Sequence, residues 1–138
     1  MALRTKLDQK LIGYITTFEQ VTHARVKDVF VSDFGILFVV QHGDAGKAIG
    51  RRGVHIKRLT HLLRKRIKVV ELSGKVEEFV KGMLDPLHMD SMEMKGSMVV
   101  LHVKDGSVKG KIIGRNGKNL QLLNDLLEKY FKVKAIVA

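Results

Sequence analysis

The chain of 138 residues has no cysteine and no tryptophan, and only one proline and two tyrosines. The lack of cysteine excludes disulfides, thiol nucleophiles and cysteine-ligated zinc, and it fits a reducing compartment. No uninterrupted apolar stretch is long enough to span a bilayer, and no apolar run near the first residue resembles a signal peptide. We therefore expect a globular, cytoplasmic protein with no membrane partner.

Acidic residues are scarce relative to basic ones. The chain carries 25 Lys and Arg against 14 Asp and Glu, which gives a formal charge of +11 and a pI near 10.0. Residues 1–73 hold 14 of the basic and 6 of the acidic residues, and residues 74–138 hold 11 and 8. A positive field attracts polyanions. The charge therefore predicts a nucleic acid partner, held mainly by the first half.

One eight-residue pattern occurs twice. Gly-Lys-Ala-Ile-Gly-Arg-Arg-Gly occupies positions 46–53, and Gly-Lys-Ile-Ile-Gly-Arg-Asn-Gly occupies positions 110–117, which is 64 residues further on. This spacing is close to half the chain. It predicts two similar domains, residues 1–73 and residues 74–138, joined by no more than Ser73 and Gly74.

The hydrophobic periodicity around each copy predicts the same order of elements, helix–strand–strand–helix–helix–strand. In the first half the predicted elements are a helix carrying Leu3, Leu7, Leu11, Tyr14, Ile15 and Phe18, strands at 25–31 and 35–40 joined by a turn at 32–35, helices at 45–49 and around Ile56, Leu59, Leu62 and Leu63, and a strand at 67–72. In the second half they are a helix at 76–84, strands at 89–95 and 97–103, a turn at Asp105–Gly106, a helix ending at Ile113, a helix carrying Leu120, Leu123 and Leu127, and a strand at 131–137. We predict an α+β fold, an α/β sandwich, in which each domain has a three-stranded mixed sheet covered by helices on one face.

The repeated loop has the chemistry of a phosphate contact. Its two glycines let a sugar-phosphate backbone approach the main chain, and the start of the following helix favours an anion. Cationic side chains lie beside the glycines, and isoleucine and leucine on the flanking helices offer an apolar groove for bases. In the first copy the candidate RNA-binding residues are Lys47, Ile49, Gly50, Arg51, Arg52, Gly53, Ile56 and Lys57, and Leu59 is expected to add apolar surface for bases. In the second copy they are Lys111, Ile113, Gly114, Arg115, Asn116, Gly117, Lys118 and Leu120, and Leu123 is expected to add apolar surface for bases.

Ile-Gly-x-x-Gly between two helices, followed by a strand, resembles the KH domain. The helix–strand–strand order before the motif is similar to the type II form of that domain. The resemblance implies that each half binds single-stranded RNA, with the GxxG loop against about four nucleotides of backbone. Two type II KH domains with almost no linker resemble the archaeal NusA-like family. That likeness implies a role in transcription termination or antitermination, with a nascent transcript as the RNA and RNA polymerase as a candidate partner.

Other functions are weighed against this one. Neither glycine-lysine segment matches the phosphate loop of an NTPase, and the six histidines lack metal-ligand spacing, so we expect no enzyme, no metal and no cofactor. A KH protein of ribosome assembly or RNA processing, acting on rRNA, stays open because its RNA contacts would be the same. A protein scaffold would bind no RNA. The sequence also leaves RNA against single-stranded DNA open.

The two copies are not equal in charge. The first has Arg52 where the second has Asn116, and its next helix begins with Lys57 and Arg58. The second copy carries Asp125 and Glu128 on its long helix. We therefore expect the first loop to supply most of the electrostatic attraction and the second to contribute register or base preference.

Overall fold

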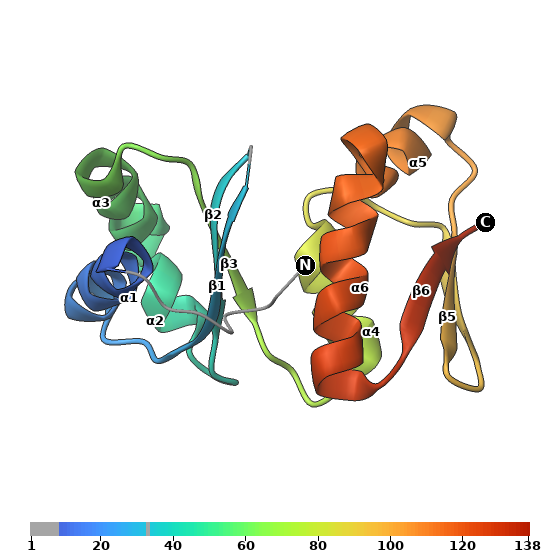
Figure 1. Ribbon diagram of the computed structural model, residues 1–138, viewed down its shortest axis with the longest axis horizontal. Helices are drawn as coiled ribbons and strands as arrows, with labels where there is room; N and C mark the ends of the chain where they lie inside the picture. The colour runs from blue at the N-terminus through green and yellow to red at the C-terminus, as the bar shows by residue number, and fades with distance from the viewer. Residues whose placement is uncertain (1–8, 33) are drawn as a thin grey trace. The chain divides into compact units, whose positions relative to one another are not determined.

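The computed structural model describes residues 9–32 and 34–138 (Figure 1). The chain divides into two compact units, of which one ends at Gly74 and the other comprises Lys75–Ala138. Leu3 and Leu7 of the predicted first helix lie outside the described residues, as does Asp33 of the predicted turn. The remaining predicted elements can all be compared with the structure.

The first unit is a three-stranded mixed sheet with helices on one of its faces (Figure 1). Strands β1 and β2 are antiparallel, and β2 and β3 are parallel, so β2 is central. Its elements in chain order are α1 (Gln9–Thr22), β1 (Val26–Ser32), β2 (Gly35–Val40), α2 (Ala45–Ile49), the 3-10 turn η1 (Arg51–Gly53), α3 (Val54–Leu63) and β3 (Ile67–Glu71).

Alternation along β2 and the helical stripe of α1 build the core of this unit. Ile36, Phe38 and Val40 are fully buried on the face that meets the helices. Phe18 of α1 stacks on Phe38 with 4.1 Å between ring centroids. Leu59 of α3 is also fully buried in this cluster, whereas Leu62 is 49% exposed and is not part of it. The predicted three-stranded mixed sheet, with helices on one of its faces, is therefore confirmed for this unit (Figure 1).

The second unit repeats this order and this pairing. Strands β4 and β5 are antiparallel, β5 and β6 are parallel, and helices lie on one side of the sheet (Figure 1). Its elements are α4 (Val76–Leu84), β4 (Ser91–Lys95), β5 (Met98–His102), α5 (Gly106–Ile113), the 3-10 turn η2 (Arg115–Gly117), α6 (Lys118–Phe131) and β6 (Lys134–Val137). The chain is thus a mixed α+β protein with two three-stranded mixed sheets.

The prediction of a strand from residue 131 is wrong at its start. Phe131 ends α6, which has 14 residues where α3 has 10, and the strand begins only at Lys134. The ring of Phe131 lies 5.5 Å from that of Phe79 on α4. An aromatic residue favours strands by propensity, but packing against a neighbouring helix overrides a preference of that size.

The predicted turn at Asp105–Gly106 is the start of a helix instead. Asp105 is the N-cap of α5, and its carboxylate accepts hydrogen bonds from the backbone N–H groups of Ser107 at 2.8 Å and Val108 at 3.3 Å. Asp followed by Gly is typical of turns, but an aspartate oxygen also satisfies the unpaired N–H groups of a first helical turn. Asp105 thus precedes the helix as its N-cap, and Gly106 is the first helical residue and not part of a turn.

The side chain of Asn124 on α6 hydrogen-bonds to the main chain of the last strand, β6. Asn124 Nδ2 donates to the carbonyl of Ala135 at 3.2 Å, and Asn124 Oδ1 accepts from the N–H of Ala135 at 2.7 Å. Ala135 is almost fully buried. The amide therefore pairs with β6 as a neighbouring strand would, which fixes the helix against the sheet behind the second loop.

Replacement of this amide is expected to be costly. Asn124→Ala removes both hydrogen bonds and leaves a buried donor and acceptor without partners, which we expect to lower the free energy of unfolding by about 2 kcal/mol. The measurement is urea unfolding followed by circular dichroism. Gln121→Ala, at an exposed position of the same helix, is the control and should change stability by less than about 0.5 kcal/mol. Equal losses in the two variants would contradict the pairing role.

Candidate nucleic-acid interface

The first GxxG segment joins α2 to α3 through two abrupt changes in backbone direction. Gly50 ends α2 with φ 80° and ψ 167°, and Gly53 precedes α3 with φ 73° and ψ 21°. Between them Arg52 has φ 56°, a left-handed conformation that few non-glycine residues adopt. The chain therefore turns sharply here and presents two arginines from a compact loop.

The second GxxG segment has the same backbone. Gly114 has φ 79° and ψ 171°, Asn116 has φ 57°, and Gly117 has φ 73° and ψ 12°. The N–H of each first glycine donates to a carbonyl four residues back, Gly50 to Gly46 at 2.9 Å and Gly114 to Gly110 at 2.8 Å. The repeat seen in the sequence is therefore a repeat of loop geometry.

Different contacts hold the short helix before each loop. The first N–H of α2, on Ala45, donates to Glu71 Oε1 at 3.1 Å, so β3 holds the start of this helix. Asp44, the N-cap of α2, uses its Oδ2 to accept from the backbone N–H of Arg25 at 2.8 Å. In the second unit Asp105 caps α5 directly. Side chains of Glu71 and Asp44 thus connect the start of α2 to the neighbouring parts of the first unit.

The first loop borders an open hollow in the protein surface. Its lining consists of Arg51, Arg52 and Lys57 together with Val54. Val54 is 52% exposed, and the sequence reasoning missed it. An exposed branched apolar side chain directly after the second glycine was the available signal. Three cations beside an exposed apolar side chain can bind a phosphate and an adjacent base or sugar.

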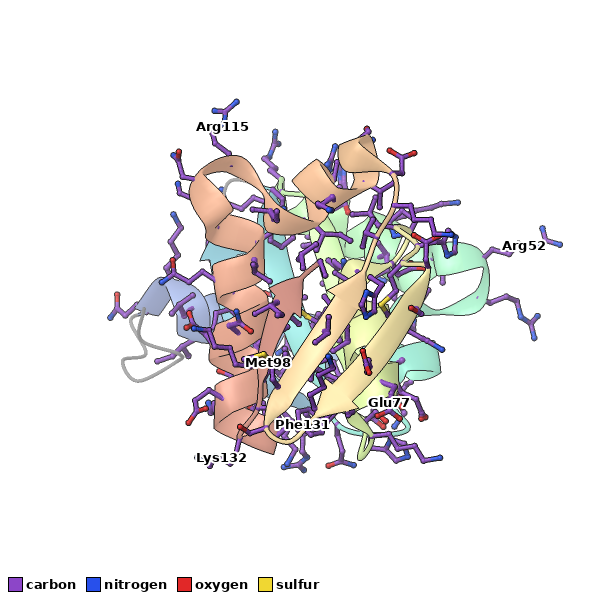
Figure 2. The ribbon with its side chains drawn as sticks, turned by 90° about the vertical axis from the view of Figure 1, so that its right-hand side faces the viewer. Arg52, Glu77, Met98, Arg115, Phe131 and Lys132 are labelled. Carbon is purple, nitrogen blue, oxygen red and sulfur yellow. The ribbon has the colours of Figure 1, made fainter. Side chains whose placement is uncertain are left out.

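The candidate residues lie at the surface or are half-buried. The four arginine and asparagine residues of the two loops are exposed, and Arg52 and Arg115 extend away from the ribbon (Figure 2). Lys57, Lys111 and Lys118 are also exposed, and all four loop glycines are half-buried. The structure therefore keeps each predicted cationic side chain accessible to a ligand.

The side chain of Lys47 extends toward the start of α2. Its Nζ lies 3.8 Å from Asp44 Oδ1 and 3.5 Å from the carbonyl oxygen of His23, near the start of α2. Both contacts are long, and an exposed pair of this kind contributes little. The ammonium group points toward the base of the helix in this structure, so it does not line the hollow.

Fewer apolar side chains are exposed beside the two loops than the sequence implied. Leu59 and Leu123 are almost fully buried in the cores and offer no surface to a base, which corrects that part of the prediction. Ile49 is 41% exposed, and Ile56, Ile113 and Leu120 are half-buried. The helical period alone did not show which members of each stripe face the core and which face the loop.

The helices that follow the two loops differ in their exposed charge. Lys57 and Arg58 are exposed on α3, and the residues 64 positions later are an exposed Gln121 and a half-buried Leu122. On α6 Glu128 is exposed and Asp125 is half-buried. The loops therefore share a backbone but not a set of charges.

Two further observations on the described residues concern metal binding and membrane insertion. Over residues 9–32 and 34–138 no three His, Cys, Asp or Glu side chains gather closely enough to hold a metal ion. Within the same ranges no helix has the length and hydropathy to cross a bilayer.

Comparison with known proteins defines the class. Residues 13–82 match the model of the KH domain, which is an RNA-binding module rather than an enzyme. The chain is 34% identical to "Probable transcription termination protein NusA" of Methanococcus vannielii over 97% of this chain and 79% of the relative. It is 30% identical to the protein of the same name from Halococcus morrhuae over 97% and 98%. The crystal structure of APE1850 matches with a TM-score of 0.67 at 32% identity, over 96% of this chain and all of that one.

The match to the domain model and the fold make the chain a KH-domain protein. Because the archaeal relatives match it along nearly its full length, the chain belongs to the archaeal NusA-like KH proteins.

Proposed function

We propose that the chain binds single-stranded RNA through two tandem type II KH domains, residues 1–73 and 74–138. The match to the KH model ends at residue 82 and so concerns the first half. The proposal for the second half is supported by its equal element order and by the equal backbone angles of its GxxG loop. A domain that conserves an unusual loop backbone presents the same N–H groups to a ligand.

The observation that carries the proposal is the hollow beside the first loop. Arg51, Arg52 and Lys57 line it together with the apolar side chain of Val54. Cations beside apolar surface suit a ligand that alternates phosphates with bases. No aromatic residue lines it, so aliphatic contacts with bases would take the place of aromatic stacking. The remaining candidate residues of both copies are proposed to line the path of the RNA.

RNA binding is expected to weaken as salt rises. If about three phosphates are contacted, counterion release predicts that affinity falls roughly tenfold or more between about 50 and 200 mM salt. Fluorescence anisotropy with a labelled single-stranded RNA measures this, with the same sequence as a duplex and as single-stranded DNA for comparison. A weaker affinity for the duplex is expected. An affinity independent of salt, or no binding at the lower concentration, would contradict the proposal.

We further propose that the RNA is a nascent transcript and that the process is transcription termination or antitermination. The support is the name of the archaeal relatives, "Probable transcription termination protein NusA". Crosslinking in cells followed by sequencing of the bound RNA tests this proposal. Enrichment of nascent transcripts is expected, together with co-purification of RNA polymerase. Enrichment of pre-ribosomal RNA instead would assign the protein to ribosome assembly.

A further inference from the structure

Each GxxG loop is closed by a side chain from the helix that follows it. His55 Nδ1 lies 2.8 Å from the carbonyl oxygen of Lys47, and Asn119 Nδ2 donates to the carbonyl oxygen of Lys111 at 3.1 Å. In both copies the bond spans eight residues and joins the last turn of one helix to the first turn of the next. The residue types differ, but the position and the acceptor are the same.

The bond satisfies a carbonyl that the loop would otherwise leave unpaired. The last four carbonyl groups of a helix lack partners within the helix. Gly50 N–H donates to the carbonyl of Gly46, and the chain then turns away. His55 therefore bonds a carbonyl of Lys47 that would otherwise face solvent. The carbonyl can only accept, so Nδ1 must carry the proton. Both the neutral Nδ1–H tautomer and the imidazolium ion can donate from this atom.

The same side chain explains the first glycine of each motif. A Cβ placed on Gly50 would lie 2.9 Å from Cγ and Nδ1 of His55, and one on Gly114 would lie 2.7 Å from Cγ and Nδ2 of Asn119. A Cβ on Gly53 or Gly117 would meet nothing within 4 Å. The closing side chain therefore packs directly over the first glycine and leaves no room for a larger residue there.

We infer that His55 and Asn119 are positioning residues, which hold the GxxG loops in their RNA-binding conformation before RNA arrives. The inference rests on the proposed RNA binding. A loop fixed in advance loses less conformational freedom on binding than a mobile one, and this difference appears as affinity. The neighbouring loop residues contact the RNA, and His55 and Asn119 act through the backbone that carries them.

The test uses the full chain and replaces His55 of the first copy by alanine or by asparagine, the residue at the same place in the second copy. His55→Ala should weaken binding of a short single-stranded RNA about five- to tenfold, as expected for the loss of one hydrogen bond. His55→Asn should restore the affinity to within about twofold, because asparagine performs this task in the second copy. His61→Ala, an exposed histidine on the same helix, is the control and should bind as the wild type does. An equal loss in His55→Ala and His61→Ala, or no rescue by asparagine, would overturn the inference.

A second measurement needs no RNA. Amide hydrogen exchange followed by NMR reports the hydrogen bonds of Gly50 and Gly53 within the loop. His55→Ala should accelerate exchange at both amides about tenfold, His55→Asn should not, and the amides of Gly114 and Gly117 should be unaffected. If wild-type protein binds no RNA, the proposed function fails while this measurement still decides the loop closure. Unchanged exchange in His55→Ala would overturn it.

Discussion

Reversal of both charges on the first loop, Arg51→Asp with Arg52→Asp, is expected to weaken binding of single-stranded RNA tenfold or more. Both side chains are exposed and line the hollow beside the loop. A hydrogen bond to a charged group contributes about 1.5–3 kcal/mol, and an aspartate at either position would also repel a phosphate. Aspartate tolerates the left-handed backbone of position 52 better than most residues, so the loop should keep its shape.

A matched variant separates local contact from overall charge. Arg64→Asp with Arg66→Asp changes the net charge by the same amount, at exposed positions at the other end of α3 and just beyond it. Screening limits the reach of such charges to about 10 Å in moderate salt, so we expect a loss of only about twofold. Anisotropy titrations at two salt concentrations compare the variants, and circular dichroism checks their folding. Equal losses of RNA affinity in the two variants would show that the arginines of the first loop act through net charge and not through direct contact with the RNA.

The corresponding change in the second loop, Arg115→Asp with Asn116→Asp, should have a smaller effect. This loop has one arginine, and position 121 of its helix is an uncharged glutamine where α3 has Lys57. Fewer cations mean fewer phosphate contacts and a smaller salt dependence. A larger loss here than in the first loop would contradict the division of roles that the charges predict.

Substitution of the first glycine is expected to destabilise the protein more than substitution of the second. Gly50→Ala places a Cβ against the ring of His55, at φ 80° and ψ 167°, a region that only glycine adopts with ease. Strain and overpacking together should cost about 2–4 kcal/mol. Gly53→Ala meets no atom within 4 Å and takes a left-handed conformation, so it should cost only about 1 kcal/mol.

Urea unfolding of the two single variants measures this difference directly. Because both changes lie in one motif and add one methyl group each, composition and location are matched. The double variant Gly50→Ala with His55→Ala removes the collision with the imidazole ring. The close approach to the backbone N of residue 55, at 3.0 Å, and the backbone strain both stay, so the double variant should recover only part of the loss. Equal costs for the two glycines, or no recovery in the double variant, would contradict the packing of His55 over Gly50.

Much of the fold could be predicted from periodicity. The order of elements, α2 at its observed bounds and the apolar stripe of α1 from Leu11 onward were all predicted. The end of α6 was not, because the 64-residue spacing assumes helices of equal length and α6 is four residues longer than α3. Phe131 is helical because it packs on Phe79, and that contact has no signature in the local sequence.

The candidate site was predictable in its residue types but not in its geometry. The repeated motif identifies the arginines and glycines of both loops. It does not show that Leu59 is buried in the core or that Val54 is exposed at the hollow. Nor does it show that the side chain of Lys47 extends toward Asp44. These outcomes depend on which side of each helix meets the sheet. The spacing of apolar residues shows that they lie on one side of a helix, but it does not show which residues at the border of that side are buried.

Two similar, glycine-containing cationic loops, of which the first lies in the more basic half, can be inferred from the order of residues alone. Composition and spacing suffice for this because charge and repeats are properties of the chain. The shared role of His55 and Asn119 in closing the loops is seen only in the tertiary structure. The two residue types share no propensity, and they become equivalent only when each reaches a carbonyl eight residues back and packs over a glycine. Such an equivalence is a matter of distance and contact, which folding alone creates.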